Sequence, residues 1–230
     1  MSGRLSLLID ADDTLWENNI YFERAFDNFC DFLDHSALTP QQVRDVLNEI
    51  ELVNAKIYGY GSKNFGRNLQ QAYRHLAERA ISDDDLRRVF SLAERILEQP
   101  LELIEGVEET LGYLSDRHEL TLFTKGHPDE QLLKVDRSGL GRYFAHKAVV
   151  KEKDAAAYSR LVEERGLARE STWMIGNSPK SDINPALDAG LHAVLVPHPH
   201  TWVLEHQDLR ESGDGKFLRV ERFADLRLHF

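Results

Sequence analysis

Short apolar segments alternate with longer amphipathic segments along most of the chain. Residues 5–9 are predominantly apolar, too short for a helix and without polar alternation, which is typical of a buried parallel strand. Similar runs at residues 120–123, 146–150, 173–175 and 193–196 are separated by helical patterns at residues 106–114, 128–138, 154–165 and 183–189. Such alternation indicates βαβ units, and it predicts an α/β fold: a Rossmann-like parallel sheet with helices on both faces.

A long segment with only helical periodicity separates the first predicted strand from the others. Thr39 is an expected N-cap, because Pro40 follows it and proline is favoured at the first position of a helix. Ser62 and Ser82 are expected to cap two further helices. The apolar residues of the C-terminal tail predict a final strand or helix that closes the core. We therefore expect a catalytic core from residues 1–15 and 101–230, with an all-helical domain of residues 16–100 inserted into it.

Composition narrows the range of partners. The chain has 230 residues, and its net charge of −11 argues against non-specific binding to nucleic acid or to an anionic membrane. No segment approaches the ~18 apolar residues that a membrane helix requires, and the N-terminus has no secretory pattern. The lone Cys30 excludes an intramolecular disulfide and is typical of a reducing compartment. We expect a cytoplasmic protein that binds neither nucleic acid nor membrane, and its state as a monomer or a homodimer stays open.

The first predicted strand ends at three carboxylates, Asp10, Asp12 and Asp13, which Thr14 follows. Open α/β sheets bind ligands at the carboxyl ends of their strands. Carboxylates so close together repel one another and raise each other's pKa unless a cation or hydrogen-bond donors balance them. The cluster therefore indicates a hard divalent metal ion, and Mg²⁺ is the expected one. Taken alone, an acidic turn exposed to solvent is the alternative.

Two later strand ends also carry polar groups. Thr124, Lys125 and Gly126 follow the strand at residues 120–123, where a hydroxyl and backbone N–H groups suit a bound phosphate. After the strand at residues 173–175, a glycine and a polar turn with Asn177 lead to Asp182 at the start of a helix. Oxygen ligands in such a turn are typical of a metal site.

The Asp10-x-Asp12-x-Thr14 spacing resembles the first motif of the haloacid dehalogenase-like (HAD) hydrolase superfamily, whose members are mostly phosphatases. The resemblance covers residues 5–13 and about 106–197, with Thr124 as the second motif and Asp182 as the distal acid of the fourth. Asn177 stands where many members have aspartate, so it could bind metal only through its carbonyl oxygen or through water.

The third motif of the superfamily is a lysine shortly before a helix. Lys151 and Lys153 both follow the strand at residues 146–150, and we choose Lys153 because it directly precedes Asp154 and the next helix. A lysine ammonium at this place can neutralise a phosphoryl oxygen and a nearby carboxylate together. In many members of the family a proline follows this lysine, whereas none follows Lys153 here.

The resemblance implies two-step phosphoryl transfer. Asp10 is the expected nucleophile and forms an aspartyl phosphate, and Asp12 is the general acid and then the general base. Thr124 and Lys153 are expected to stabilise the phosphoryl group. The expected metal site consists of Asp10, Asp12 through its backbone carbonyl, Asp182 and Asn177. The expected substrate contacts are Thr124, Lys125, Lys153, Trp16 and Asn19, and the inserted helices resemble the cap that closes over the site in this superfamily.

The expected activity is the Mg²⁺-dependent hydrolysis of a small phosphomonoester, a phosphorylated metabolite. A phosphotransferase or phosphomutase would use the same site. A hydrolytic dehalogenase of the same fold needs no metal and typically lacks the second aspartate, so Asp12 and Asp182 argue against it. A non-catalytic regulatory module would usually have lost the nucleophile or a metal ligand. His198 and His200 could suggest a metal pair, but two histidines without a third ligand are more typical of the surface.

Overall fold

The computed structural model describes residues 3–210 and 215–230, and its internal contacts divide the chain into two compact units. The core unit comprises Met1–Glu17 and Leu101–Phe230, and the helical unit comprises Asn18–Pro100. Trp16 therefore belongs to the core unit rather than to the insertion, because the backbone around it pairs with residues beyond the insertion: Glu17 N donates to Glu102 O at 2.9 Å. Within the described part of the chain, the helices lack either the length or the apolar character needed to span a bilayer.

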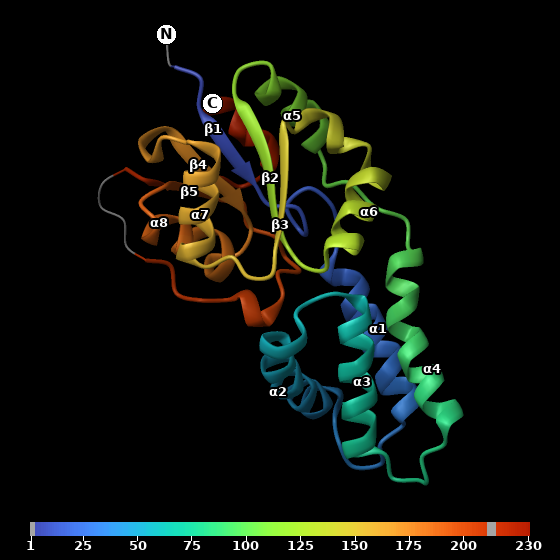
Figure 1. Ribbon diagram of the computed structural model, residues 1–230. Helices are drawn as coiled ribbons and strands as arrows, with labels where there is room; N and C mark the ends of the chain where they lie inside the picture. The colour runs from blue at the N-terminus through green and yellow to red at the C-terminus, as the bar shows by residue number, and fades with distance from the viewer. Residues whose placement is uncertain (1–2, 211–214) are drawn as a thin grey trace. The chain divides into compact units, whose positions relative to one another are not determined.

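Six parallel strands form one sheet in the core unit, in the order β3-β2-β1-β4-β5-β6 (Figure 1). The strands are β1 (Ser6–Ile9), β2 (Glu119–Lys125), β3 (His146–Val150), β4 (Thr172–Gly176), β5 (His192–Leu195) and β6 (Phe217–Arg219). The chain moves outward from β1 to β3 and then returns to place β4 on the other side of β1. Ligands bind at the carboxyl ends of strands where the order reverses in this way. The predicted parallel α/β fold is confirmed.

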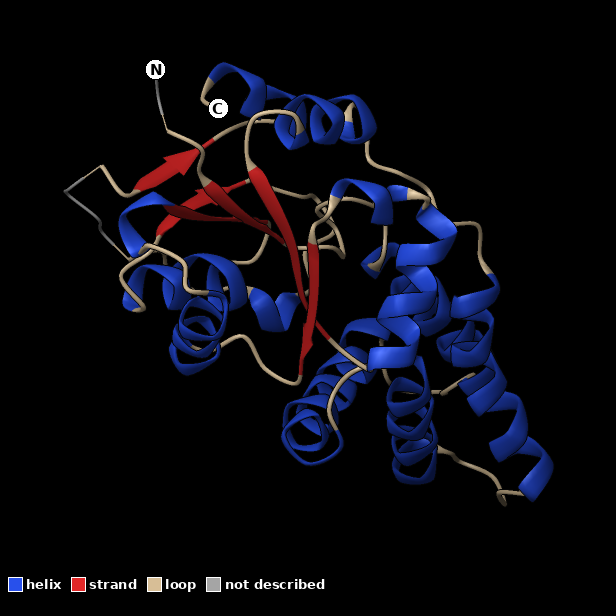
Figure 2. Ribbon diagram, turned by 45° about the horizontal axis from the view of Figure 1, so that its top comes forward, coloured by secondary structure: helices blue, strands red, loops and turns tan. Residues whose placement is uncertain are grey.

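Helices cover both faces of this sheet (Figure 2). Leu7 and Ile9 of β1 pack into one apolar cluster with α5, α6 and the C-terminal 3₁₀ helix, whereas Leu8 packs into a second cluster with α7 and α8. Each of these three side chains is fully buried, and burial of this kind contributes about 1.5–3 kcal/mol per side chain. The helices of the core unit are α5 (Val107–Ser115), α6 (Pro128–Ser138), α7 (Ala155–Arg165) and α8 (Asn184–Asp188), with 3₁₀ turns at Leu140–Tyr143, Arg169–Ser171, Val203–Glu205 and Phe223–Leu228.

The helical unit consists of helices around an apolar core of its own, which includes Phe29, Leu47 and Leu69. Its elements are α1 (Asn19–Leu33), α2 (Pro40–Tyr58), α3 (Ser62–Leu76), α4 (Asp83–Glu94) and a 3₁₀ turn (Arg95–Glu98). Thr39 and Ser82 cap α2 and α4, as predicted: Thr39 accepts from the Gln42 backbone N–H, and Ser82 accepts from that of Asp85. The structure also shows that each cap is part of a capping box.

The start of α3 differs from the prediction. Ser62 is the first helical residue rather than the cap, and Gly61 occupies the cap position. The backbone there has a φ of 119°, a conformation that glycine adopts more readily than serine.

Candidate active site

Three charged side chains meet at the carboxyl ends of β1 and β4. Lys153 Nζ donates to Asp10 Oδ1 at 2.5 Å and to Asp182 Oδ1 at 2.7 Å. All three side chains are buried, so little water screens their interactions. Two carboxylates thus share one ammonium, which leaves an excess of negative charge in a buried place.

Local structure places each of these groups. Asp10 directly follows β1, and its backbone N–H donates to Ile175 O of β4 at 2.9 Å. Lys153 lies between β3 and α7, immediately before Asp154, which caps α7 by accepting from the Ala157 N–H at 2.7 Å. The cap fixes where α7 begins and therefore where the preceding lysine leaves the backbone. Lys151 is exposed and lies outside this cluster.

Asp182 lies in a π-helical turn, Pro179–Ile183, that precedes α8. The predicted helix therefore begins with an irregular turn, which Ser178 caps by accepting from the Ser181 N–H at 2.9 Å. Ser178 N donates to Asp182 Oδ2 at 2.9 Å. A Cβ at Gly176 would lie 2.3 Å from the same Oδ2, so only glycine lets the Asp182 carboxylate lie over the end of β4.

Electrostatics at this cluster favour a further positive charge. Burial raises the pKa of Asp10 to about 7, and the neighbouring Asp182 raises it as well, while Lys153 acts in the opposite direction. Burial also opposes the charge on Lys153, but Asp10 and Asp182 outweigh it and raise the pKa of Lys153 above its ordinary value. The lysine therefore stays an ammonium, and a cation beside Asp10 would help to keep that carboxyl ionised.

The Thr14 hydroxyl lies near two oxygen atoms from the ends of β1 and β4, which are possible ligands of a hard metal ion. Its Oγ1 lies 3.0 Å from Asp10 Oδ2 and 3.4 Å from Asn177 Oδ1. Asn177 Nδ2 donates to Thr201 Oγ1 at 3.0 Å, which turns its carbonyl oxygen toward Thr14. Asp10, Asn177 and Asp182 thus offer two carboxylates and an amide oxygen, a donor set that fits Mg²⁺.

Asp12 points to a different set of partners. Lys134 Nζ lies 2.6 and 2.7 Å from its two carboxylate oxygens, Gln131 Nε2 donates to Oδ2 at 2.9 Å, and Trp16 Nε1 donates to Oδ1 at 2.8 Å. Burial opposes the charge, but Lys134, Gln131 and Trp16 lower the pKa of Asp12 below its ordinary value. Asp12 is therefore held as a carboxylate. Trp16, a predicted substrate contact, is fully buried with its N–H on Asp12.

Sequence reasoning missed Gln131 and Lys134. Their spacing of three residues on the predicted helix at residues 128–138 puts them on one face, which is a weak signal. Thr124, which is buried at the end of β2, belongs to the same network through a contact of 3.3 Å between its Oγ1 and Gln131 Oε1. A Cβ at Gly126, where φ is 148°, would lie 2.8 Å from Gln131 Nε2, so a glycine keeps room for this side chain.

Lys125 lies in a second network, beside the turn that carries Asp182. Its Nζ lies 2.5 Å from Glu205 Oε1 and donates to Ser181 Oγ at 2.8 Å. Glu205 Oε2 accepts from the hydroxyls of Ser178 and Ser181 at 2.6 and 2.5 Å. Lys125 and Glu205 therefore stabilise the turn that carries Asp182. No pattern in the sequence indicated a role for Glu205. The remaining predicted contact, Asn19, begins α1 in the helical unit, outside the core unit.

A parallel sheet with an aspartate after its first strand, a buried lysine and a second aspartate after β4 defines the class of haloacid dehalogenase-like folds. The model of the family described as haloacid dehalogenase-like hydrolase matches residues 7–196, and the chain belongs to this family. No curated protein matches the chain.

Solved structures agree with this assignment. A haloacid dehalogenase-like family hydrolase from Xanthomonas campestris is 27% identical with a TM-score of 0.84, over 99% of this chain and 94% of that chain. A 2-haloacid dehalogenase from Pseudomonas syringae pv. Tomato is 18% identical with a TM-score of 0.65, over 98% of each chain. A predicted phosphoglycolate phosphatase from Haemophilus somnus is 16% identical with a TM-score of 0.63, over 100% and 99%. The last two proteins share the fold of this chain, but they are named for different reactions, dehalogenation and phosphate hydrolysis.

Proposed function

We propose that this protein is a Mg²⁺-dependent hydrolase of a small phosphomonoester and that Asp10 forms an aspartyl phosphate. The observation that supports this most is that the buried carboxylates of Asp10 and Asp182 share the Lys153 ammonium, a single positive charge for two negative ones. A buried excess of negative charge, with an amide oxygen from Asn177 nearby, suits a divalent cation. A dehalogenase needs no such ion.

In this proposal, Asp10, Asp182 and Asn177 hold the Mg²⁺, with the Asp12 backbone carbonyl as a further ligand. When bound, the ion offsets negative charge on the phosphoryl oxygens and on Asp10. Lys153 supplies a fixed positive charge at the same place, which costs no rearrangement during the reaction. Thr124 remains the proposed contact to the phosphoryl group.

The reaction then proceeds in two steps. An oxygen of Asp10 bonds to phosphorus while the ester P–O bond breaks, and the leaving oxygen takes a proton from Asp12. In the second step, the Asp12 carboxylate removes a proton from water, which attacks phosphorus, releases inorganic phosphate and restores Asp10. The contacts of Asp12 favour its carboxylate form, so the structure suits the second step better than the first. The first step requires the protonated form, and its rate should fall as pH rises.

The helical unit is the proposed cap. Closure of such a unit over the core would exclude water from the first step and would bring residues such as Asn19 to the leaving group. The substrate is then a small phosphorylated metabolite.

The decisive experiment measures phosphate release from a panel of phosphomonoesters, with and without Mg²⁺, beside halide release from 2-haloacids. We expect phosphate release that requires Mg²⁺ and is lost in Asp10→Asn. Asp136→Asn, which changes an exposed aspartate of α6, is the matched control and should keep the activity. Halide release without metal, and no phosphate release from any ester, would contradict the proposal and favour a dehalogenase.

A further inference from the structure

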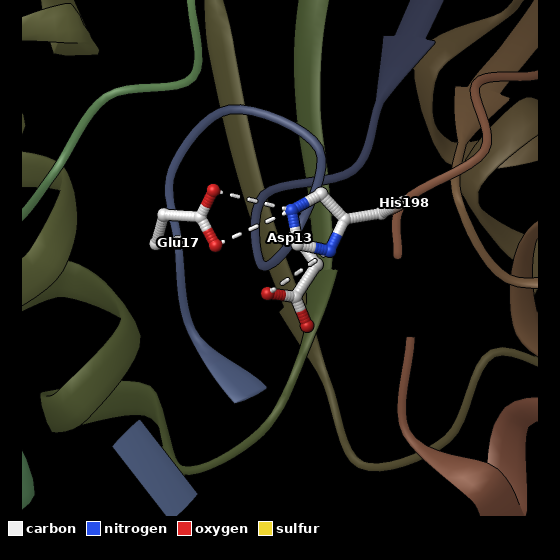
Figure 3. Close-up of side chains that lie close together, drawn as sticks. All are labelled: Asp13, Glu17 and His198. Atoms are coloured by element: carbon white, nitrogen blue, oxygen red, sulfur yellow. Dashed lines mark hydrogen bonds and ion pairs between the residues drawn. The ribbon is translucent and has the colours of Figure 1, made fainter. Parts of the chain in front are cut away.

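A second group of metal-ligating side chains lies in the core unit, and it shares no residue with the cluster around Lys153. Asp13, Glu17 and His198 point toward one another (Figure 3), and one possible ligand atom from each lies within 4.8 Å of the others. His198 Nε2 lies 3.3 Å from Glu17 Oε2, and its Nδ1 lies 3.8 Å from Asp13 Oδ1. We propose that these three residues bind a first-row divalent transition-metal ion, for which Zn²⁺ is the probe. The proposal does not depend on the phosphatase activity.

Burial and charge support a cation at this place. The exposed fractions of the Asp13 and His198 side chains are 6% and 8%, and that of Glu17 is 28%. Two carboxylates carry two negative charges, whereas one imidazole carries one positive charge at most. A divalent ion would balance both carboxylates and would bind one of the two imidazole nitrogens. The three ligand atoms, which lie within 4.8 Å of one another, would then have to approach the separation of about 3.3 Å that tetrahedral zinc gives at bond lengths of about 2.0–2.1 Å.

The ligand types separate this site from the proposed Mg²⁺ site. Asp10, Asp182 and Asn177 offer only oxygen atoms, which Mg²⁺ prefers. An imidazole nitrogen with two carboxylates is instead typical of zinc and of neighbouring transition metals, and three protein ligands leave a position for water. The two sites should therefore prefer different ions.

A cavity beside His198 gives such an ion a way in. Its volume is about 300 Å³, and its lining includes His198, Asn177, Thr201 and His206. This space is large enough for several waters, since each occupies about 30 Å³ in the liquid. An ion bound here would tie the loop after β1, which carries Asp13, to the segment after β5, which carries His198.

The site corrects the interpretation of the two histidines. His198 was expected at the surface with His200, but its side chain is mostly buried and its partners lie 181 or more residues away in sequence, at Glu17 and Asp13. His200 is exposed and is not among the possible ligands. The two proposed ligands that join His198 therefore come from the segment after β1, far from it in the sequence.

The test is a calorimetric titration of the full chain with Zn²⁺ in saturating Mg²⁺, so that the oxygen-ligand site is already filled. We expect one bound Zn²⁺ in the wild type, and binding at least about 10–100-fold weaker in His198→Asn and in Glu17→Gln. His200→Asn is the matched control and should bind as the wild type does. Asp182→Asn should keep Zn²⁺ binding even though it removes a proposed Mg²⁺ ligand, which separates failure of this proposal from failure of the proposed function.

Co²⁺ in place of Zn²⁺ supplies a spectroscopic readout, because visible absorption bands report its ligands. We expect these bands in the wild type and their loss in Glu17→Gln, a partly exposed position where the fold should survive if His198→Asn does not fold. No Zn²⁺ binding by the wild type in excess Mg²⁺ would overturn the proposal, and His198 would then be an imidazole that bridges two carboxylates. Equal weakening in His200→Asn and His198→Asn would overturn it too.

Discussion

The ammonium of Lys153 lies 2.5 Å from Asp10 Oδ1, although 143 residues separate the two in sequence. The same ammonium contacts Asp182, so one positive charge serves two buried carboxylates. Asp12, only two residues from Asp10, has an ammonium of its own in Lys134. The pKa values of the two aspartates of the first motif are therefore shifted in opposite directions. Burial raises the pKa of Asp10, whereas Lys134 and the other hydrogen-bond donors around Asp12 lower the pKa of Asp12.

Replacing the proposed nucleophile should stop turnover without unfolding the protein. Asp10→Asn keeps the shape of the side chain but removes the oxygen that would attack phosphorus, and we expect phosphate release to fall by at least about 10³-fold. Phosphate release under Mg²⁺ measures this, and thermal unfolding checks the fold. A variant with nearly normal turnover would exclude Asp10 as the nucleophile.

The two lysines after β3, Lys151 and Lys153, should contribute very differently to the free energy of unfolding. Lys153→Met leaves Asp10 and Asp182 buried without their ammonium, and breaking a buried pair in this way costs about 3–5 kcal/mol. Lys151→Met changes an exposed side chain and should alter stability by no more than about 0.5 kcal/mol. Urea unfolding of both variants measures the difference, and Mg²⁺ should restore part of the stability of Lys153→Met. Equal losses in the two variants would show that the buried ammonium does not stabilise the carboxylates.

Lys134 should set the pH range of the first chemical step. In Lys134→Met, the pKa of Asp12 rises because its nearest positive charge is gone, so the protonated form persists to higher pH. The high-pH limb of kcat/KM, which reports ionisations of the free enzyme, should therefore move to higher pH. Lys151→Met serves as the control and should leave the profile in place. A limb that stays where it is in Lys134→Met would mean that Asp12 is not the acid.

Glu51, in α2, should make the stability of the helical unit depend on pH. Its Oε2 is buried and has no hydrogen-bond partner among the described residues, and burial raises the pKa of Glu51 from 4.5 to about 7. The folded protein therefore binds this proton more tightly than the unfolded chain. The contribution to stability is complete below about pH 4.5 and is lost as pH rises through about 7, a change of up to about 3 kcal/mol at 1.36 kcal/mol per pKa unit.

Glu51→Gln should remove this dependence, since an amide resembles the protonated carboxyl at every pH. We expect the variant to be more stable than the wild type above neutral pH and similar to it in acid. Urea unfolding at both ends of this pH range measures the difference. Glu49→Gln, at an exposed position of the same helix, is the control. A wild type whose stability follows the same pH course as that of Glu51→Gln would contradict the argument.

The sequence by itself determined those features that depend on neighbouring residues. The helix at Pro128–Ser138 and the strand at His146–Val150 have the bounds that periodicity predicts. The N-caps at Thr39 and Ser82 could be predicted because each bonds to a backbone N–H only three residues further along the chain. Alternation of strands and helices was enough for the parallel α/β fold, since it leaves few other topologies.

Only the tertiary structure decided which side chains meet. Gln131 and Lys134 reach Asp12 across 119 and 122 residues, and Glu205 reaches Ser178 across 27. His198 contacts its sequence neighbour His200, whose backbone N–H donates to His198 Nδ1 at 3.2 Å, but its Nε2 lies near Glu17, 181 residues away. Such contacts depend on how whole helices and loops pack and on which face each one turns inward. A local pattern shows that a helix has a polar face, but the identity of its partner is set by packing that involves distant parts of the chain.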